Sequence, residues 1–216
     1  MQRRDFSHAV LAAGATAIGV AGSFSPRSAR AQVGGFKEGT NYQRLGKAAP
    51  VDSPAGQIEV VEFFAYSCIH CFNFEPVFNE WMHKVPSYVT VKRVPVAFSE
   101  AFVPMQRLYY ALEAMDLVDK LHEKVFQAIH VEKLPLTTPD PIVAWVGKQG
   151  VDSAKFTSFY NSFAMAGKAK RAIQLQDAYQ VEGTPALGVA GKYYVGGQGP
   201  TTLRVADALI AQLRKS

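Results

Sequence analysis

The sequence predicts an α/β fold in which a strand-and-helix unit is interrupted by a helical segment of about 80 residues. Two strand patterns, at Ile58–Phe64 and 88–98, precede this segment, with a helical pattern between them. Residues 101–180 then show helical spacing of apolar side chains without a strong strand pattern. Strand patterns return after Gly183, and a last amphipathic helix follows them. These three observations predict the order of elements and hence the fold class.

The part before the helical segment is expected to hold three strands and one helix. Residues 42–45 could pair as a short edge strand. Ile58–Phe64 is β-branched and aromatic with little alternation, which is typical of a strand buried on both faces. A helix is expected over 67–84, with a kink at Pro76, and an alternating strand over 88–98. The inward positions expected on the helix are Phe72, Pro76, Phe78 and Met82.

The remaining elements follow from apolar stripes and turn residues. Pro104 suits a helix start, and the stripes between it and residue 180 are interpreted as core rather than as a cofactor site. Ala186–Val189 and Tyr193–Val195 flank a hairpin turn, and Thr201-Thr202 should cap the final helix. The stripes before residue 180 comprise Leu108, Ala111, Leu112 and Met115; Leu121, Val125, Phe126 and Ile129; Ile142, Trp145 and Val146; and Phe156, Phe159, Tyr160 and Phe163. The apolar stripe of the final helix comprises Leu203, Ala206, Leu209, Ile210 and Leu213.

Residues 1–31 have the features of an export signal. An Arg-Arg pair forms a basic start, a weakly apolar run follows over 9–22, and Ala29-Arg30-Ala31 matches the A-x-A pattern of a cleavage site. The apolar run is too short and too rich in glycine to span a bilayer. We therefore expect a mature chain that starts at Gln32. The arginine pair also resembles twin-arginine signals, so the export route stays open.

The charge of the chain gives no support to nucleic-acid binding. The formal net charge is +5, from 23 basic and 18 acidic side chains. Residues 1–31 hold four arginines and one aspartate, so 19 basic and 17 acidic side chains remain in the rest of the chain. That remainder contains no run of Lys or Arg and no basic–aromatic stripe. We expect no nucleic-acid partner.

Both cysteines of the chain stand in Cys68-Ile69-His70-Cys71, shortly after the Ile58–Phe64 strand. A strand-to-helix corner would place Cys68 at a helix N-terminus, where free N–H groups and the helix dipole favour the thiolate that attacks disulfides. A disulfide at this spacing closes so small a loop that it constrains the unfolded chain little. We therefore interpret the pair as redox-active, with an exposed, attacking Cys68 and an inner, resolving Cys71.

His70 lies between the two cysteines. An imidazolium at this position would add positive charge beside a Cys68 thiolate. The alternative is a polar helix residue that points into water.

Gly183-Thr184-Pro185 precedes the expected hairpin. A cis bond before Pro185 would turn the backbone of Thr184 toward the thiols, where its N–H and C=O could bind a client chain as an added strand. The alternative is an ordinary trans proline in a loop, and the spacing alone favours it.

Glu62 is an acid within the strand that is expected to be buried. A carboxylate in such a place pairs with a cation or has a raised pKa, and near Cys71 it could accept the proton of the resolving thiol. Arg93 on the neighbouring strand could be its ion-pair partner. The alternative is that Glu62 faces a solvated sheet edge and that Arg93 is an exposed residue at the end of its strand.

These segments resemble one known family. Residues 61–71 together with Phe74-Glu75 are similar to the active-site segment of the DsbA-type periplasmic thiol:disulfide oxidoreductases. Gly183-Thr184-Pro185-Ala186 with Gly191-Lys192-Tyr193 resembles the cis-proline loop and hairpin of that family. The resemblance implies a thioredoxin-like domain formed by residues 32–98 and 181–216, and an inserted helical domain over residues 99–180.

The resemblance also implies roles and partners. Cys68 would be the nucleophile, Cys71 the buried resolver, His70 the residue that stabilises the thiolate, Pro185 the cis-proline and Glu62 the buried acid. The expected activity is donation of the Cys68–Cys71 disulfide to reduced or unfolded secreted polypeptides in the periplasm, without a bound cofactor. A quinone-linked membrane oxidase of the DsbB type would reoxidise the pair. A monomer is expected, because residues 32–50 leave no room for the dimerisation domain of the homodimeric isomerases.

The sequence departs from the family pattern at two positions. Ile69-His70 stands where Pro-His is best known, and Arg93 stands where a lysine is often found near the buried acid. Isoleucine lacks the ring constraint of proline, so the sequence leaves the reduction potential open. Arg93 retains the charge of the lysine, although a guanidinium and an amine differ in proton chemistry.

Three other interpretations remain open at this stage. A reductase or isomerase of the same fold would use the same residues. A zinc site would need two further ligands from His70, His83, His122 and His130, none of which form a pair at the usual zinc-ligand spacing. A chaperone-like module with a vestigial disulfide would keep its activity after Cys68→Ser.

Overall fold

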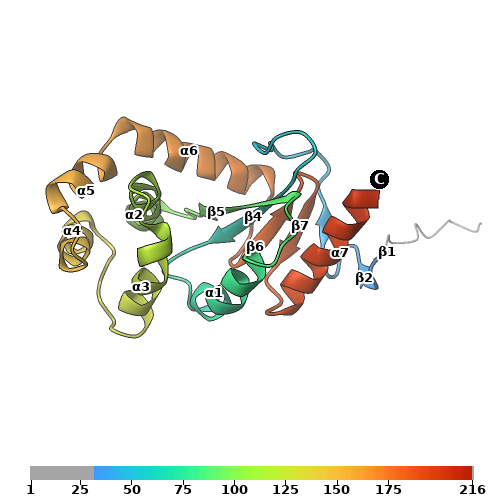
Figure 1. Ribbon diagram of the computed structural model, residues 1–216, viewed down its shortest axis with the longest axis horizontal. Helices are drawn as coiled ribbons and strands as arrows, with labels where there is room; N and C mark the ends of the chain where they lie inside the picture. The colour runs from blue at the N-terminus through green and yellow to red at the C-terminus, as the bar shows by residue number, and fades with distance from the viewer. Residues whose placement is uncertain (1–31, 216) are drawn as a thin grey trace, which may run out of the picture.

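The computed structural model describes residues 32–215, which form a five-stranded mixed sheet with helices on both faces and a block of helices at one end (Figure 1). Two short strands, β1 (Gln32–Val33) and β2 (Phe36–Lys37), form a separate antiparallel pair beside the last helix. The export signal expected over 1–31 lies outside the described residues. Within residues 32–215, no helix has the length and apolar character needed to cross a bilayer.

The sheet has the strand order β3-β7-β6-β4-β5, with β4 parallel to β5 and the other pairs antiparallel. Strand β4, which lies between β6 and β5, has the predicted bounds, and all seven of its residues are buried. The predicted edge strand is β3, and β5 ends earlier than the expected 88–98 strand because its partner β4 ends opposite Pro95. The strands are β3 (Gln43–Arg44), β4 (Ile58–Phe64), β5 (Val89–Pro95), β6 (Ala186–Val189) and β7 (Tyr193–Gly196).

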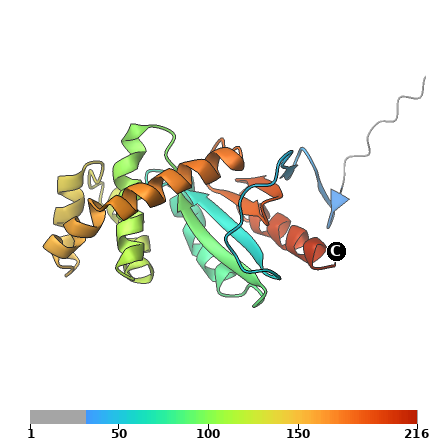
Figure 2. The same cartoon turned by 90° about the horizontal axis from the view of Figure 1, so that it is seen from above.

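Five α-helices lie between β5 and β6, as the helical periodicity of that segment predicts. Helix α2 starts at Val103 with Pro104 in its first turn, after a short 3₁₀ turn over Glu100–Phe102. Figure 2 shows α6 running from this block back along the sheet. Whether the block is a separate domain over 99–180 stays a prediction. The helices are α2 (Val103–Ala114), α3 (Val118–His130), α4 (Pro139–Lys148), α5 (Ser153–Tyr160) and α6 (Phe163–Ala178).

Each face of the sheet packs against a different set of helices. On one face, Val61 and Phe63 of β4 join a core formed with α2 to α6. On the other face, Val60 joins a core formed with α1 (Ile69–Met82) and α7 (Thr201–Lys215). The alternation of side chains along β4 therefore places Glu62 on the same face as Val60, the face that α1 and α7 cover.

Two inward positions expected from the sequence are wrong. Pro76 is exposed, because the buried face of α1 runs through Cys71, Phe74, Glu75 and Phe78, and Pro76 lies beside that face rather than on it. Phe163 is 91% exposed, because it is the first residue of α6 at the outer tip of the helical block, where no element covers it.

The hairpin between β6 and β7 has the predicted position and is held from two sides. Gly191 in its turn has φ +67°, and a Cβ there would come within 2.5 Å of the Ala49 carbonyl oxygen. The Tyr179 hydroxyl accepts a hydrogen bond from the Gly191 amide at 2.9 Å. These contacts fix β6, and β6 in turn fixes the Thr184–Pro185 segment that precedes it.

Candidate active site

Cys68 lies at the N-terminus of α1, at the corner where the chain leaves β4. It has extended dihedrals (φ −86°, ψ 115°), and its carbonyl oxygen accepts hydrogen bonds from the amides of Cys71 and Phe72, both at 3.1 Å. It is thus the N-cap residue, and no side chain supplies the usual capping hydrogen bond. A sulfur at the N-cap can accept hydrogen bonds from the first free N–H groups of the helix.

The two thiols are reduced in this structure and have opposite surroundings. Cys68 is partly exposed, whereas Cys71 is 1% exposed and faces the sheet. A hydrogen bond from the Cys71 thiol, followed by contributions from Thr184 and the amides of Cys71 and His70, lowers the pKa of Cys68 to about 5 against the effect of burial. Burial and the hydrogen bond to Cys68 raise the pKa of Cys71 far above its ordinary value. One thiol is an anion at neutral pH and the other retains its proton.

The Thr184–Pro185 peptide bond is cis, as the family resemblance implies and contrary to what spacing alone favours. Pro185 is buried at the start of β6, and the Thr184 carbonyl oxygen lies 3.3 Å from Cys68 Sγ. The loop after α6 therefore meets the helix start after β4, which places the backbone of Thr184 beside the reactive sulfur.

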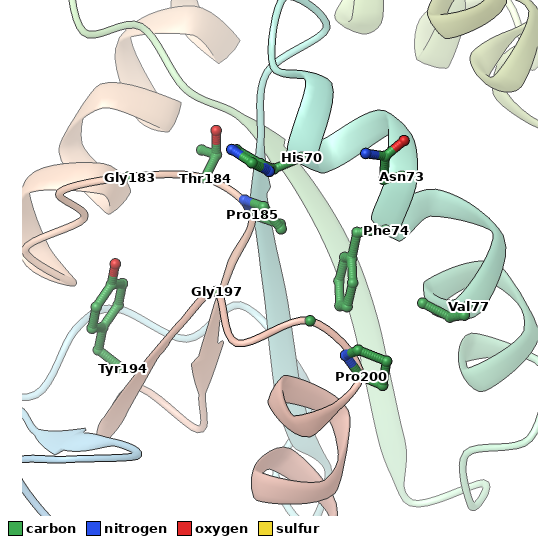
Figure 3. Close-up of a pocket in the computed structure, with 11 residues that line it drawn as sticks. His70, Asn73, Phe74, Val77, Gly183, Thr184, Pro185, Tyr194, Gly197 and Pro200 are labelled. Carbon is green, nitrogen blue, oxygen red and sulfur yellow. The ribbon is translucent and has the colours of Figure 1, made fainter.

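His70 is exposed and lines a cavity of about 540 Å³ beside the thiols. In Figure 3 its ring lies next to Thr184 and Pro185, on the side of α1 that faces the cis-proline loop. Its backbone amide contributes to the low pKa of Cys68. The side chain is thus placed beside the cis-proline loop and in contact with water. The cavity is lined by His70, Asn73, Phe74, Val77, Gly183, Thr184, Pro185, Tyr194, Gly197, Gly199 and Pro200.

Glu62 lies beneath α1, away from solvent. It is 1% exposed and accepts a hydrogen bond from Arg93 Nε at 3.1 Å, and Arg93 Nη2 also donates to Glu75 Oε1 at 2.6 Å. Burial raises the pKa of Glu62 well above its usual range, and the charge of Arg93 only partly offsets this effect. Glu75 is one turn after Cys71 on the buried face of α1, so the resolving thiol and this second partner of Arg93 share the face.

The sequence does not reveal that this buried cluster is larger. Glu75 could have been noticed because it is four residues after Cys71, but His122 and Tyr66 carry no local pattern that points to the site. His122 Nδ1 lies 2.8 Å from the Tyr66 hydroxyl, and His122 Nε2 lies 3.3 Å from Glu75 Oε2. The cluster therefore extends from β4 through α1 to α3.

The four histidines considered for zinc occupy separate environments. His70 is at the thiols, His83 is exposed at the end of α1, and His122 and His130 both contact Tyr66. Within residues 32–215, no three His, Cys, Asp or Glu side chains are grouped so that they could hold a metal ion.

Comparison with known proteins identifies the family. A family model described as a DSBA-like thioredoxin domain matches residues 92–206. The thiol:disulfide interchange protein DsbA of Bordetella pertussis is 39% identical over 220 residues, which cover 100% of both chains. This chain belongs to the DsbA family. The DsbA of Pseudomonas aeruginosa is 40% identical over 188 residues, covering 85% of this chain and 89% of its own.

Solved structures give the same assignment. The crystal structure of P. aeruginosa DsbA superposes with a TM-score of 0.80 at 39% identity, covering 83% of this chain and 95% of that one. The oxidoreductase DsbA1 of Neisseria meningitidis superposes with a TM-score of 0.75 at 29% identity, covering 84% and 96%. The chain thus has the thioredoxin-like DsbA fold, and it is a thiol:disulfide oxidoreductase.

Proposed function

We propose that this DsbA-family chain is an exported dithiol oxidase that donates a Cys68–Cys71 disulfide to reduced secreted polypeptides. The observation that carries the proposal is the opposite environment of the two sulfurs, which lowers the pKa of Cys68 to about 5 and raises that of Cys71. A stabilised thiolate stabilises the reduced pair, so the disulfide of the same pair is a strong oxidant of other thiols.

The proposed transfer uses the exposed sulfur twice. A client thiolate attacks Cys68 Sγ of the disulfide, the Cys68–Cys71 bond breaks, and Cys71 leaves as a thiolate that takes up a proton. A second client thiolate then attacks the client sulfur of the mixed disulfide, and Cys68 leaves as a thiolate. The client loses two electrons and gains a disulfide, and the Cys68–Cys71 pair gains the two electrons. Because a thiol of low pKa leaves fastest, Cys68 is suited to the second step.

The remaining site residues take supporting roles in this proposal. Glu62 exchanges the proton of Cys71 from beneath α1, with Arg93 holding the carboxylate in place. The imidazole of His70 adds positive charge beside Cys68. Pro185 holds the backbone of Thr184 next to the sulfur, where its N–H and C=O bind the client chain as an added strand.

The cellular setting follows from family membership and from the expected signal at 1–31. We propose a periplasmic monomer that works without a bound cofactor, because the Cys68–Cys71 disulfide itself accepts the two electrons. A quinone-linked membrane oxidase of the DsbB type would remove these electrons and restore the disulfide.

The test is the equilibrium of the Cys68–Cys71 pair in a series of glutathione buffers. Two reference proteins set the scale, with potentials of about −120 mV for DsbA and about −270 mV for thioredoxin. The oxidase proposal expects a potential nearer to the first value, and a thioredoxin-like value would favour a reductase. In a client-oxidation assay, Cys68→Ser should abolish turnover, and retained activity would favour the chaperone-like alternative.

A further inference from the structure

Helix α3 holds the active-site loop through two histidines. His122 Nδ1 lies 2.8 Å from the hydroxyl of Tyr66, and His130 Nε2 lies 2.8 Å from the carbonyl oxygen of the same residue. The two histidines are eight residues apart, which places them on one face of the helix about two turns from each other. Since Tyr66 is two residues before Cys68, both ends of a residue in the catalytic corner are bound by a helix of the inserted block.

His122 also connects this loop to the acids beneath α1. Its Nε2 lies 3.3 Å from Glu75 Oε2, and the other oxygen of Glu75 accepts from Arg93, which in turn donates to Glu62. The line Tyr66–His122–Glu75–Arg93–Glu62 is thus a continuous series of polar contacts, in which His122 Nε2 faces Glu75 without the geometry of a hydrogen bond. Each of its side chains is at most 8% exposed.

The hydrogen-bonding capacity of each group determines which atoms donate and which accept along this line. Burial lowers the pKa of His122, so the ring is neutral and has one N–H. Nε2 faces a carboxylate, which accepts hydrogen bonds, and Nδ1 faces a hydroxyl, which can donate one. The proton of the ring therefore belongs on Nε2, and the Tyr66 hydroxyl donates to Nδ1.

We propose that His122 is a positioning residue of the redox centre, which joins the Tyr66 hydroxyl to the Glu75 carboxylate and thereby sets the geometry of the acid pair around Arg93. This inference rests on the proposed function, since it concerns the proton that Glu62 exchanges with Cys71. If the imidazole is lost, Glu75 loses its polar contact with α3 and shifts relative to Arg93. The pairing of Arg93 with Glu62 then changes, and so does the pH at which Glu62 gives up its proton.

A purely steric role for His122 makes a different prediction. The ring sits among Phe64, Phe126 and Tyr109, with centroid distances of 5.0 to 5.8 Å. If packing were its only purpose, phenylalanine would serve as well as histidine. The ring has a polar contact at each nitrogen, 2.8 Å from Nδ1 to the Tyr66 hydroxyl and 3.3 Å from Nε2 to the Glu75 carboxylate. Phenylalanine could make neither contact, which favours the positioning role. The titratable and charged groups that act on His122 are Glu75 of α1, Arg93 of β5, Glu123 of α3, Tyr109 of α2 and Tyr66 of the loop.

The experiment measures the rate of the resolving step as a function of pH. Reduced protein is mixed with oxidised glutathione, so that the Cys68 thiolate attacks, one glutathione leaves, and Cys68 forms a mixed disulfide. The Cys71 thiol then loses its proton and attacks Cys68 Sγ, which releases the second glutathione. Acid quenching and mass spectrometry follow the decay of the mixed disulfide in the wild type, His122→Phe, His122→Gln and the surface control His83→Gln.

The conservative variant separates the two roles. A glutamine can accept from the Tyr66 hydroxyl and donate to Glu75, whereas phenylalanine can do neither. We expect His122→Phe to shift the plot of the resolution rate against pH by about one pH unit. At a pH on the slope of that plot, this shift is a roughly tenfold change in rate. His122→Gln and His83→Gln should follow the wild type. A His122→Phe profile that overlays the wild type would overturn the proposal, and so would a His122→Gln profile displaced as far as that of His122→Phe.

A second variant, Tyr66→Phe, tests the proposal if His122→Phe does not fold. Tyr66→Phe removes one oxygen and retains the ring, and it should displace the profile in the same direction; a profile that overlays the wild type would overturn the proposal. The outcome for the wild type tells this inference apart from the proposed function. A wild type that does not equilibrate with glutathione contradicts the oxidase itself, whereas a wild type that cycles beside unshifted variants contradicts only the role of His122.

Discussion

The mouth of the site, around Cys68, and its floor beneath α1, around Cys71, Glu62 and Arg93, shift pKa values in opposite directions. At the mouth, hydrogen bonds around the partly exposed Cys68 lower its pKa to about 5. On the floor, desolvation dominates and raises the pKa of Cys71 and Glu62, even though Arg93 lies 3.1 Å from the Glu62 carboxylate. The two cysteines are only three residues apart, so one turn of helix separates two electrostatic environments.

This contrast shows which physical effect governs each region. Donors aimed at the sulfur stabilise charge at the mouth, so removing a donor should change reactivity more than stability. A buried cation between two buried acids holds the floor together, so removing it should change stability more than reactivity. Three experiments test this difference between mouth and floor, in decreasing order of expected effect.

The largest expected effect is on the floor, from Arg93→Met. Glu62 and Glu75 would then be buried without their cation, which should lower the free energy of unfolding by about 3–5 kcal/mol. Chemical denaturation measures this change. Arg204→Met on the exposed face of α7 is the matched control, with an expected change within about 0.5 kcal/mol. The comparison of mouth and floor fails if Arg93→Met shifts the titration of Cys68 but leaves stability unchanged.

The second effect is at the mouth and concerns pH. The rate of alkylation of the reduced protein should rise with a midpoint at pH about 5, because Cys68 is partly exposed and Cys71 is buried. Since the pKa of Cys68 falls from 9.0 to about 5 on folding, the reduced form gains stability from pH about 5 up to about 9, and this gain is lost as the pH falls through 5. The oxidised form has no Cys68 thiol and should lack this dependence. An alkylation midpoint near the ordinary thiol value of about 8.5 would contradict the assignment.

The smallest effect tests the departure from the family pattern. Ile69 is the first residue of α1 and is 46% exposed, and Cys68 before it already has the extended dihedrals that a following proline requires. Ile69→Pro should therefore stabilise the protein by about 0.4–1 kcal/mol, through a less flexible unfolded chain. Denaturation of the oxidised forms measures it, with Val77→Ala on the exposed side of α1 as a reference substitution. A loss of stability would mean that the helix start is not free to accept proline.

The sequence predicts the mouth better than the floor, for a physical reason. A strand buried on both faces, such as β4, leaves a continuous apolar run, and a C-x-x-C at its end marks the helix start. Both patterns are local. On the floor, the pairing of Glu62 with Arg93 is predicted because the two residues lie on neighbouring strands, and the structure confirms it. The floor also depends on the contacts of His122 with Tyr66, 56 residues away, and with Glu75. Such contacts follow from the packing of α1 and α3 on the sheet, and no spacing in the chain encodes them.

The wrong inward positions have related causes. The buried face of α1 is hard to predict because a glutamate, which usually avoids the interior, takes one of its buried places at Glu75. The core position predicted for Phe163 is wrong because aromatic spacing cannot tell a packed stripe from the bare tip of a helical block. The cis form of the Thr184–Pro185 bond follows from the family resemblance and not from the spacing.

The contact between Cys68 and Thr184 joins residues 116 positions apart. Between them the chain must form β5, the whole helical block and the turn into β6 before the carbonyl oxygen reaches the sulfur. Because a chain is made from its N-terminus, both cysteines are present long before the loop that completes their environment. The thiol pair therefore gains its full reactivity last, once Thr184 lies beside Cys68.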